Sequence, residues 1–302
     1  MNNLLLIDGH SILNRAFYGI PMLTNHEGIH TNAIYGFINI MLRAMEDEKS
    51  DHIAVAFDLK APTFRHKMYE MCKGTRKPMP AELHEQVPVI KEILASMNIP
   101  VITLEGYEAD DILGTVGKKA QSLGYNVVIL SGDRDLLQLA DEHIKIRLPK
   151  TIKGRTEIEN YYPEDVMEKY MATPSEFIDL KALMGDSSDN IPGVPGIGEK
   201  TAMSIISKYH SIENAYEHVE ELTPAKAKNS LRENYDLAKL SKVLATIETD
   251  APVEFNIEDS AIGNIFTKEA YELFTRYELK SLLKYFDKSS FCLLYTSPSP
   301  RD

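Results

Sequence analysis

The chain has 302 residues, 43% of them hydrophobic and 26% charged, and a net charge of −12, which predicts a globular protein of two domains with a sizeable core. Only two cysteines occur, Cys72 and Cys292, and their separation excludes a disulfide framework and a cysteine zinc site, so we expect a reducing, cytoplasmic location. Neither a secretory signal nor an apolar run of membrane-spanning length is visible, and a membrane partner is therefore not expected.

Three strand-like runs in the first half of the chain each lead to an aspartate. Their Leu, Ile and Val residues suit strands buried on both faces. We predict these strands at residues 4–8, 52–57 and 126–131. Helical patterns lie between and beside them, at residues 32–47, 82–97 and 108–124. The alternation predicts an α/β domain with a mainly parallel sheet, in which the carboxyl ends of the strands share one rim.

The second half of the chain loses the strand signal from about residue 163. Helices separated by Gly/Pro turns are predicted at residues 163–170, 174–185, 199–209, 231–247 and 267–286. We therefore place a domain boundary near residue 175, with an α/β domain over 1–175 and a helical domain over 176–290. The last segment, FCLLYTSPSPRD at 291–302, completes no element and is expected to be an unstructured or non-native tail.

Nine carboxylates are predicted to gather at the strand ends and at the entrance to the second domain. They are Asp8, Asp58, Glu108, Asp110, Asp111, Asp133, Asp135, Asp186 and Asp189. Each one alone has an ordinary explanation as a helix cap, a helix-dipole partner or an Asx turn. As a group they would repel one another unless a cation neutralised them or their pKa values rose. Hard oxygen donors indicate Mg²⁺ or Mn²⁺, and their number favours two ions, which suit the hydrolysis of phosphate esters.

A glycine-rich stretch, NIPGVPGIGEKTA at residues 190–202, follows the acids. A Walker A loop is excluded because Glu199 stands where a lysine is required, and a dinucleotide fingerprint is weak because no strand precedes the glycines. We favour a helical hairpin whose backbone N–H groups bind a DNA phosphate, with Lys200 and Thr201 nearby, over a plain interhelical loop.

The negative net charge by itself argues against a nucleic-acid partner, but one segment of the chain is locally basic. Residues 60–77 contain six Lys or Arg residues and one acid, Glu70. On composition alone a solvated basic loop explains this segment, and its meaning depends on the rest of the chain.

Six ordered segments resemble the 5′-nuclease domain of bacterial DNA polymerase I, which belongs to the flap endonuclease family. They are LLLIDGHSILNRAFY, VAFDLKAPTFRH, KGTRKPMP, GYEADDILG, LSGDRDLLQL and GDSSDNIPGVPGIGEKTA. The resemblance covers about residues 3–290. It implies a PIN-like α/β nuclease core with a helical arch around residues 65–100, followed by a helix–three-turn–helix domain. It also implies that all nine acids belong to the metal site.

The resemblance implies roles for further residues. Arg65, Lys73 and Arg76 match basic positions that steer the scissile phosphate or the 5′ end, and Lys73 is the best candidate to stabilise developing phosphoryl charge. Arg15 and Tyr18 match substrate contacts, with core packing an equal alternative for Tyr18. The duplex-binding element, which can also hold K⁺ through backbone carbonyls, matches Gly196, Ile197, Gly198, Lys200 and Thr201.

The expected function is a monomeric, Mg²⁺-dependent 5′→3′ exonuclease and flap endonuclease in DNA replication and repair, with Mn²⁺ as a substitute ion. Its expected partners are 5′ flaps, nicks and free 5′ ends, and RNA primers are a further candidate. Two alternatives remain open: a non-catalytic DNA-structure-binding module and a small-molecule metal phosphohydrolase. We expect no polymerase activity, and the sequence leaves open whether the chain is part of a longer polymerase.

Overall fold

A six-stranded sheet forms the middle layer of the computed structural model, which describes residues 2–71, 74, 78–152 and 155–287. The strand order is β3-β2-β1-β4-β5-β6, and only β6 runs antiparallel to its neighbour. The strands are β1 (Asn3–Asp8), β2 (His52–Ala56), β3 (Val101–Ile102), β4 (Asn126–Leu130), β5 (Ile144–Ile152) and β6 (Arg155–Tyr161). The predicted, mainly parallel α/β sheet is confirmed.

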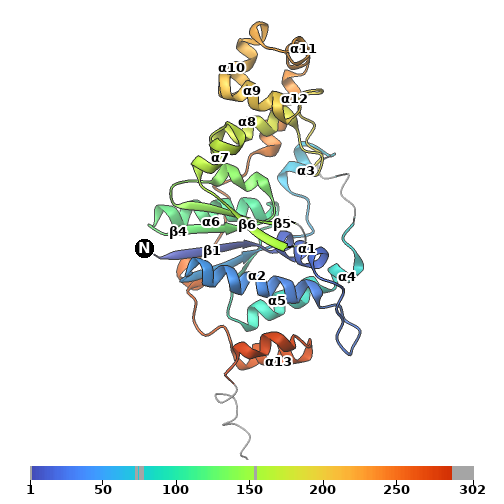
Figure 1. Cartoon of the computed structure of the whole chain (residues 1–302), viewed down its shortest axis with the longest axis vertical. Helices are drawn as coiled ribbons and strands as arrows, with labels where there is room; N and C mark the ends of the chain where they lie inside the picture. The colour runs from blue at the N-terminus through green and yellow to red at the C-terminus, as the bar shows by residue number, and fades with distance from the viewer. Residues whose placement is uncertain (1, 72–73, 75–77, 153–154, 288–302) are drawn as a thin grey trace, which may run out of the picture.

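The central strands bury both faces, as their apolar runs predict. Leu4 and Leu6 of β1 pack into the core on one face, and Leu5 and Ile7 pack into the core on the other. In Figure 1, α6 (Ala109–Ser122) lies above the sheet, and α2 (Asn32–Glu48) and α5 (Gln86–Ser96) lie below it. Helix α1 (Gly9–Gly19) starts where β1 ends, so it stands at the rim to which the parallel strands point.

A helical region extends from the upper layer (Figure 1). Its helices are α7 (Pro163–Tyr170), α8 (Pro174–Met184), α9 (Glu199–Tyr209), α10 (Ile212–Glu217), α11 (Ala225–Glu233) and α12 (Tyr235–Ala245). Residues of this region, such as Leu180, Ile206 and Ala238, belong to the same apolar cluster as Leu6 and Ile129 of the sheet. One continuous core therefore holds the helical region to the α/β layer.

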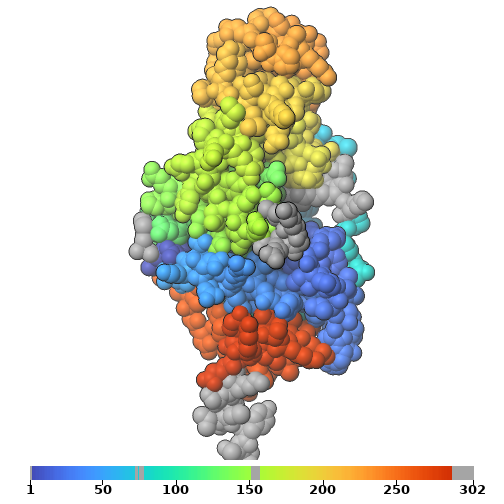
Figure 2. Space-filling model, viewed as in Figure 1, coloured from blue at the N-terminus to red at the C-terminus, as the bar shows by residue number. Residues whose placement is uncertain are grey.

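The C-terminal segment returns to the lower layer, away from the helical region. Helix α13 (Lys268–Arg276) and the 3₁₀ turn after it pack near α5, where Phe274 and Phe286 join the lower apolar cluster. Figure 1 shows this segment in red beneath α2 and α5, and Figure 2 shows the same red segment at the opposite end from the orange helical region. Within the helical domain predicted over residues 176–290, α13 thus packs against the α/β core through the buried side chain of Phe274.

The segment predicted to form an arch, residues 65–100, divides between two places. Helix α3 (Phe64–Met68) and the short α4 (Ala81–His84) lie at the rim side of the molecule, whereas α5 packs in the lower layer. The apolar residues of α5, Ile90 and Ile93 among them, explain that placement. Within the described residues, no helix is long and apolar enough to cross a membrane.

Candidate active site

Asp8 stands at the end of β1 and caps α1. Its Oδ1 accepts a hydrogen bond from the Ser11 backbone N–H (3.0 Å), and its Oδ2 accepts one from the Ser131 hydroxyl (2.7 Å). Gly9 follows it because a Cβ there would lie 2.5 Å from the Phe57 ring. The missing side chain lets α1 start against β2, so the Asp8 carboxylate is fixed at the rim.

Asp58 ties the end of β2 to the start of α6. Its Oδ1 accepts a hydrogen bond from the Ala109 backbone N–H (2.7 Å), and its Oδ2 lies 3.4 Å from Nδ1 of His10. Asp110 is half-buried in the first turn of α6. Because β1 and β2 are paired with Asp8 opposite Ala56, Asp58 lies two residues beyond that level on the same rim.

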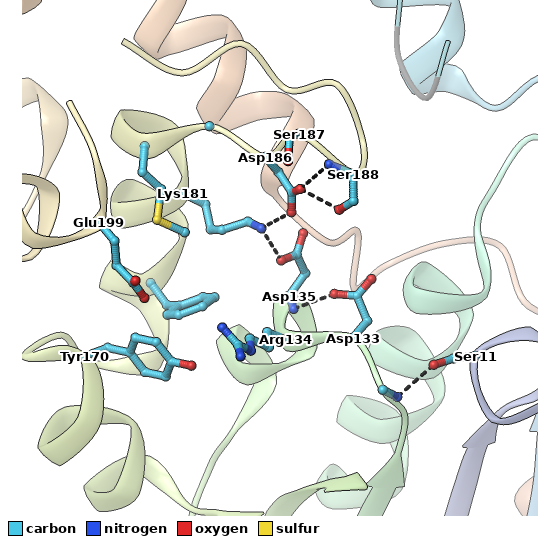
Figure 3. A pocket seen from close by; sticks show the side chains of 14 residues that line it. Ser11, Asp133, Arg134, Asp135, Tyr170, Lys181, Asp186, Ser187, Ser188 and Glu199 are labelled. Carbon is cyan, nitrogen blue, oxygen red and sulfur yellow. Dashed lines mark hydrogen bonds and ion pairs between the residues drawn. The ribbon is translucent and has the colours of Figure 1, made fainter. Parts of the chain in front are cut away.

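Lys181 lies between two further carboxylates (Figure 3). Its Nζ is 2.7 Å from Oδ1 of Asp135 and also donates to Oδ2 of Asp186. Asp133 accepts the backbone N–H of Asp135 (2.9 Å), and Asp186 accepts the backbone N–H of Ser188 (2.7 Å). Lys181 was not among the site residues predicted from the sequence. Its only local signal is a position five residues before Asp186, in the last turn of α8.

Burial and like charges change the acidity of this group. Burial, with smaller contributions from Asp58 and Asp133, raises the pKa of Asp8 to about 6. Burial and the nearby Asp133 raise the pKa of Asp135 to about 7, against the opposing effect of Lys181. Burial would also raise the pKa of Asp186, but hydrogen bonds from Lys181 and Ser188 hold it at about 2. Crowded carboxylates with shifted pKa values are typical of functional sites.

The donor set fits a hard divalent cation, although the carboxylates do not form a closed cage. All donors are carboxylate oxygens, which Mg²⁺ and Mn²⁺ prefer. Among the described residues, no group of three or more His, Cys, Asp or Glu side chains is arranged to hold one ion. Asp58 and Asp133 both lie close enough to Asp8 to raise its pKa, and Asp135 and Asp186 share Lys181. Asp189 is half-buried in the turn after Asp186.

Arg65 and Asp111 form a buried ion pair rather than an exposed part of the rim. Nη1 and Nη2 of Arg65 donate to the two oxygens of Asp111 at 2.8 and 2.7 Å, and Asp111 is 0% exposed. Arg65 also donates to the carbonyls of Leu244 and Thr246, and it lies 3.6 Å from Oε2 of Glu108. This pair is therefore buried beside Glu108 and links α3, α6 and the end of α12.

The glycine-rich stretch forms the predicted hairpin between α8 and α9. Gly193 has φ +61°, and a Cβ on it would lie 2.3 Å from the Gly185 nitrogen, so the two backbone segments can touch only as glycines. Gly198 is the residue before α9, Ile197 is buried, and Gly196 is exposed with φ +81°. Lys200 and Thr201 follow in the first turn of α9.

Helix α11 supports this hairpin in a way that the sequence did not indicate. The Ser230 hydroxyl donates to the Pro195 carbonyl (2.5 Å), and the Lys226 side chain reaches across Gly196. Lys226 is exposed. A second cation besides Lys200 thus stands at the tip of the hairpin.

The remaining predicted residues lie on α1 or outside the described part of the chain. Arg15 is half-buried, and burial lowers its pKa. Tyr18 is 72% exposed, which excludes core packing as its role. Lys73 and Arg76, together with Cys72 and the tail at 291–302, lie outside the described residues.

A cavity of about 470 Å³ opens beside the carboxylates. Asp133, Asp135 and Asp186 line one side, and Arg134, Tyr170 and Glu199 line the other (Figure 3). The cavity therefore runs from the carboxylates to the start of α9, where the hairpin ends.

Replacement of Lys181 by methionine tests the balance of charge in this site. We expect a loss of about 3 kcal/mol in the free energy of unfolding at pH 8, because Asp135 and Asp186 would lose their shared cation. The loss should be smaller at pH 6, where Asp135, whose pKa is about 7, takes up a proton. Urea unfolding at both pH values, with and without Mg²⁺, measures it. A loss that is equal at both pH values and unaffected by Mg²⁺ would contradict this account.

Two family models match the chain in succession. Residues 3–171 match the model described as the 5′-3′ exonuclease N-terminal resolvase-like domain. Residues 172–279 match the model described as the 5′-3′ exonuclease C-terminal SAM fold.

Curated relatives carry the name DNA polymerase I. The chain is 45% identical over 287 residues to the protein of Bacillus caldotenax and 46% identical over 281 residues to that of Bacillus subtilis strain 168. The matches cover 95% and 93% of this chain but 32% of each relative. The chain therefore spans about a third of the length of these relatives.

Solved structures share the fold over nearly the whole chain. The 5′-exonuclease of T5 with bound zinc has a TM-score of 0.67 at 21% identity, covering 96% of this chain and 98% of that one. A T5 flap endonuclease in complex with DNA and metal ions has a TM-score of 0.66 at 20% identity, with the same coverage. The catalytic core of Rad2 with a DNA substrate has a TM-score of 0.62 at 14% identity, covering 94% and 91%.

Proposed function

Because the chain belongs to the 5′-3′ exonuclease family, we propose that it is a divalent-metal-dependent nuclease that hydrolyses DNA phosphodiesters from 5′ ends and at 5′ flaps. The observation that carries the proposal is the meeting of Asp8, Asp58 and Asp133 at one rim of the sheet, next to Asp135 and Asp186 at the helical hairpin. Family membership agrees with the resemblance seen in the six sequence motifs.

Five carboxylates would hold the ions, and these are Asp8, Asp58, Asp133, Asp135 and Asp186. A pair of Mg²⁺ ions, or Mn²⁺ in their place, would supply an activated water and charge compensation at the leaving oxygen. Glu108, Asp110 and Asp189 surround this group and would act through water. Asp111 would instead position Arg65, since Arg65 bonds both of its oxygens.

The chain's own residues would orient the substrate. The Ile197 N–H closes the hairpin turn by donating to the Val194 carbonyl (3.0 Å), so the backbone N–H groups of Gly196 and Gly198 and the N-terminus of the 11-residue α9 would hold a strand of duplex DNA by its phosphates. Lys200, Thr201 and Lys226 would add contacts at the same place, and K⁺ could bind the hairpin carbonyls. None of these contacts reads a base, so recognition would follow DNA structure rather than sequence.

The rim near α1 and α3 would receive the 5′ end of the cleaved strand. Exposed Tyr18 offers a ring for stacking on a base, and Arg15 lies one helical turn before it. Lys73 and Arg76 remain proposed contacts of the scissile phosphate. We propose 5′ flaps, nicks, free 5′ ends and RNA primers as substrates. We further propose that the protein acts as a monomer in a bacterial cytoplasm.

A substrate panel tests the proposed function. The chain is mixed with a 5′-labelled flap duplex, a nicked duplex, single-stranded DNA and a small phosphomonoester, in Mg²⁺, in Mn²⁺ and in EDTA. We expect cleavage near the flap junction that needs a divalent ion, and no comparable turnover of the phosphomonoester. Tight flap binding without cleavage in either ion would instead establish a DNA-structure-binding module. Equal turnover of the phosphomonoester would establish a small-molecule phosphohydrolase.

A further inference from the structure

The wall of the cavity that faces away from the carboxylates carries polar groups of its own. Arg134, exposed at the start of the 3₁₀ turn after β4, points across the cavity toward Tyr170 and Glu199 (Figure 3). Tyr170 is the last residue of α7, and Glu199 is the first residue of α9. Three separate elements therefore bring these side chains to the space between the metal-site carboxylates and the hairpin.

Within the described residues, the side-chain polar groups of Arg134 and Tyr170 have no hydrogen-bond partner, although the Tyr170 ring itself belongs to the core. Within the described part of the chain, the Arg134 guanidinium makes no hydrogen bond or ion pair, whereas Lys181 on the opposite wall is engaged by two carboxylates. Tyr170 is only 4% exposed, and among the described residues its buried hydroxyl has no hydrogen-bond partner. Buried polar groups nearly always have a partner, so a hydroxyl left without one at a cavity wall calls for a ligand.

The packing of the Tyr170 ring fixes the position of its hydroxyl at the cavity wall. Its ring stands edge-on to Phe177 with centroids 5.0 Å apart, and both residues line the cavity. Burial raises the pKa of the tyrosine, so the hydroxyl keeps its proton and can donate. A guanidinium and a hydroxyl donor together suit an anion with several acceptor oxygens.

We propose that Arg134 and Tyr170 form a subsite for one phosphodiester of the DNA strand as it passes from the carboxylates to the hairpin, an inference that rests on the proposed function. Arg134 supplies the positive charge and Tyr170 a neutral hydrogen bond. Glu199 stands opposite and repels the same phosphate, which limits the strength of the contact. The subsite sets the path of the strand and takes no part in the reaction itself.

Single neutral phosphates test the subsite. Methylphosphonates are placed one at a time at successive positions of the cleaved strand, on the duplex side of the junction, and KM and kcat are measured for the wild-type chain and for Arg134→Gln. At one position the neutral linkage should raise the wild-type KM about tenfold, as loss of a charge-assisted hydrogen bond would. The same linkage should leave Arg134→Gln unchanged, because the contact is already gone. Equal effects in both proteins at every position would overturn the subsite.

Variants of the other two residues separate a ligand site from a structural role. Glu199→Gln should lower KM several-fold, opposite to Arg134→Gln, because a repulsive charge is removed. Tyr170→Phe should raise KM about threefold while leaving the free protein as stable as before or more so, since an unsatisfied hydroxyl is lost. The slope of log KM against log salt should fall by about 0.9 in Arg134→Gln. If Tyr170→Phe destabilises the protein and leaves KM unchanged, the hydroxyl is structural and the subsite is wrong.

A matched surface variant completes the design. Arg43 of α2 is exposed and, among the described residues, pairs with Asp47 alone, at 3.9 Å, so Arg43→Gln changes the net charge equally without touching the cavity. It should reproduce neither the KM effect nor the position dependence. Failure of the wild-type chain to cleave any substrate would count against the proposed function. A cleaving wild type with an unchanged Arg134→Gln would count against the subsite alone.

Discussion

Replacement of Asp8 by asparagine should abolish cleavage of a 5′-flap duplex and at the same time make the metal-free protein more stable at pH 8. Cleavage should fall at least about a thousandfold, because this carboxylate would no longer bind an ion at the centre of the rim. The fold should survive, since an asparagine can still accept from the Ser11 N–H and can donate to Ser131. Opposite effects on activity and stability are expected of residues selected for function.

The gain in stability follows from the raised pKa. Burial holds the pKa of Asp8 at about 6, above its usual 3.8, so the native state binds a proton that the unfolded state has already lost between these pH values. The ionised carboxylate therefore costs stability above pH 6, by about 3 kcal/mol at roughly 1.4 kcal/mol per pKa unit. Asparagine removes this cost. The advantage should shrink as the pH falls through 6 and be mostly gone by pH 4, where the native carboxyl is protonated and the unfolded one, with its usual pKa of 3.8, is about half protonated.

Urea unfolding in EDTA at pH 8, 6 and 4, together with single-turnover cleavage in Mg²⁺, measures both effects. Asp236→Asn is the control, since Asp236 is exposed and paired with Lys239 on α12 far from the rim. The control should change neither quantity. Retained cleavage in Asp8→Asn would show that Asp8 is not a metal ligand. A variant less stable than the wild type at pH 8 would show that the ionised Asp8 carboxylate does not cost stability.

The convergence of the rim acids was predictable because two local signals combine. Apolar runs that lead to Asp8, Asp58 and Asp133 predict buried strands, and parallel strands bring their carboxyl ends together. The hairpin was predictable from the glycines of residues 190–202, and the structure adds that the backbones of Gly185 and Gly193 touch there. Each of these features depends on residues that are close in sequence or on a general rule of sheet topology.

Long-range pairings could not be read in the same way. Arg65 and Asp111 lie in separate sequence segments, VAFDLKAPTFRH and GYEADDILG, and only the folded chain shows that they form an ion pair. Lys181 lies within a helical pattern, and nothing in the sequence indicates that it forms ion pairs with both Asp135 and Asp186. The pattern of residues 267–286 correctly predicts helical structure in α13. An amphipathic pattern says that one face is buried and not which layer covers it, so its return to the lower layer went unforeseen.

The β5–β6 hairpin was missed for a different reason. Its strands carry charged residues, including Lys145, Arg147 and Glu159, that pair with α2 or with neighbouring side chains. Such a segment shows no apolar run, and its outer strand, β6, lies at the edge of the sheet. Edge strands with charged side chains are common because they discourage pairing with other chains.

Replacement of Arg65 by methionine should lower the free energy of unfolding by about 3–5 kcal/mol, the usual cost of leaving a buried charge without its partner. Asp111 is completely buried and would keep only the backbone N–H groups of Glu108 and Glu248 as donors. The carbonyls of Leu244 and Thr246 would also lose their donor. Arg65→Lys should recover only part of the loss, because an ammonium cannot bridge both carboxylate oxygens.

A double replacement distinguishes a positioning role of Arg65 from direct contact with the substrate. In Arg65→Met combined with Asp111→Leu the buried charge is gone, so about half of the lost stability should return, and cleavage measured well below the unfolding transition should return with it. Arg43→Met, at an exposed position, should stay within about 0.5 kcal/mol of the wild type. A double variant that regains stability while kcat stays as low as in Arg65→Met would show that the guanidinium acts on the substrate. Arg65 would then have to leave Asp111 when DNA binds.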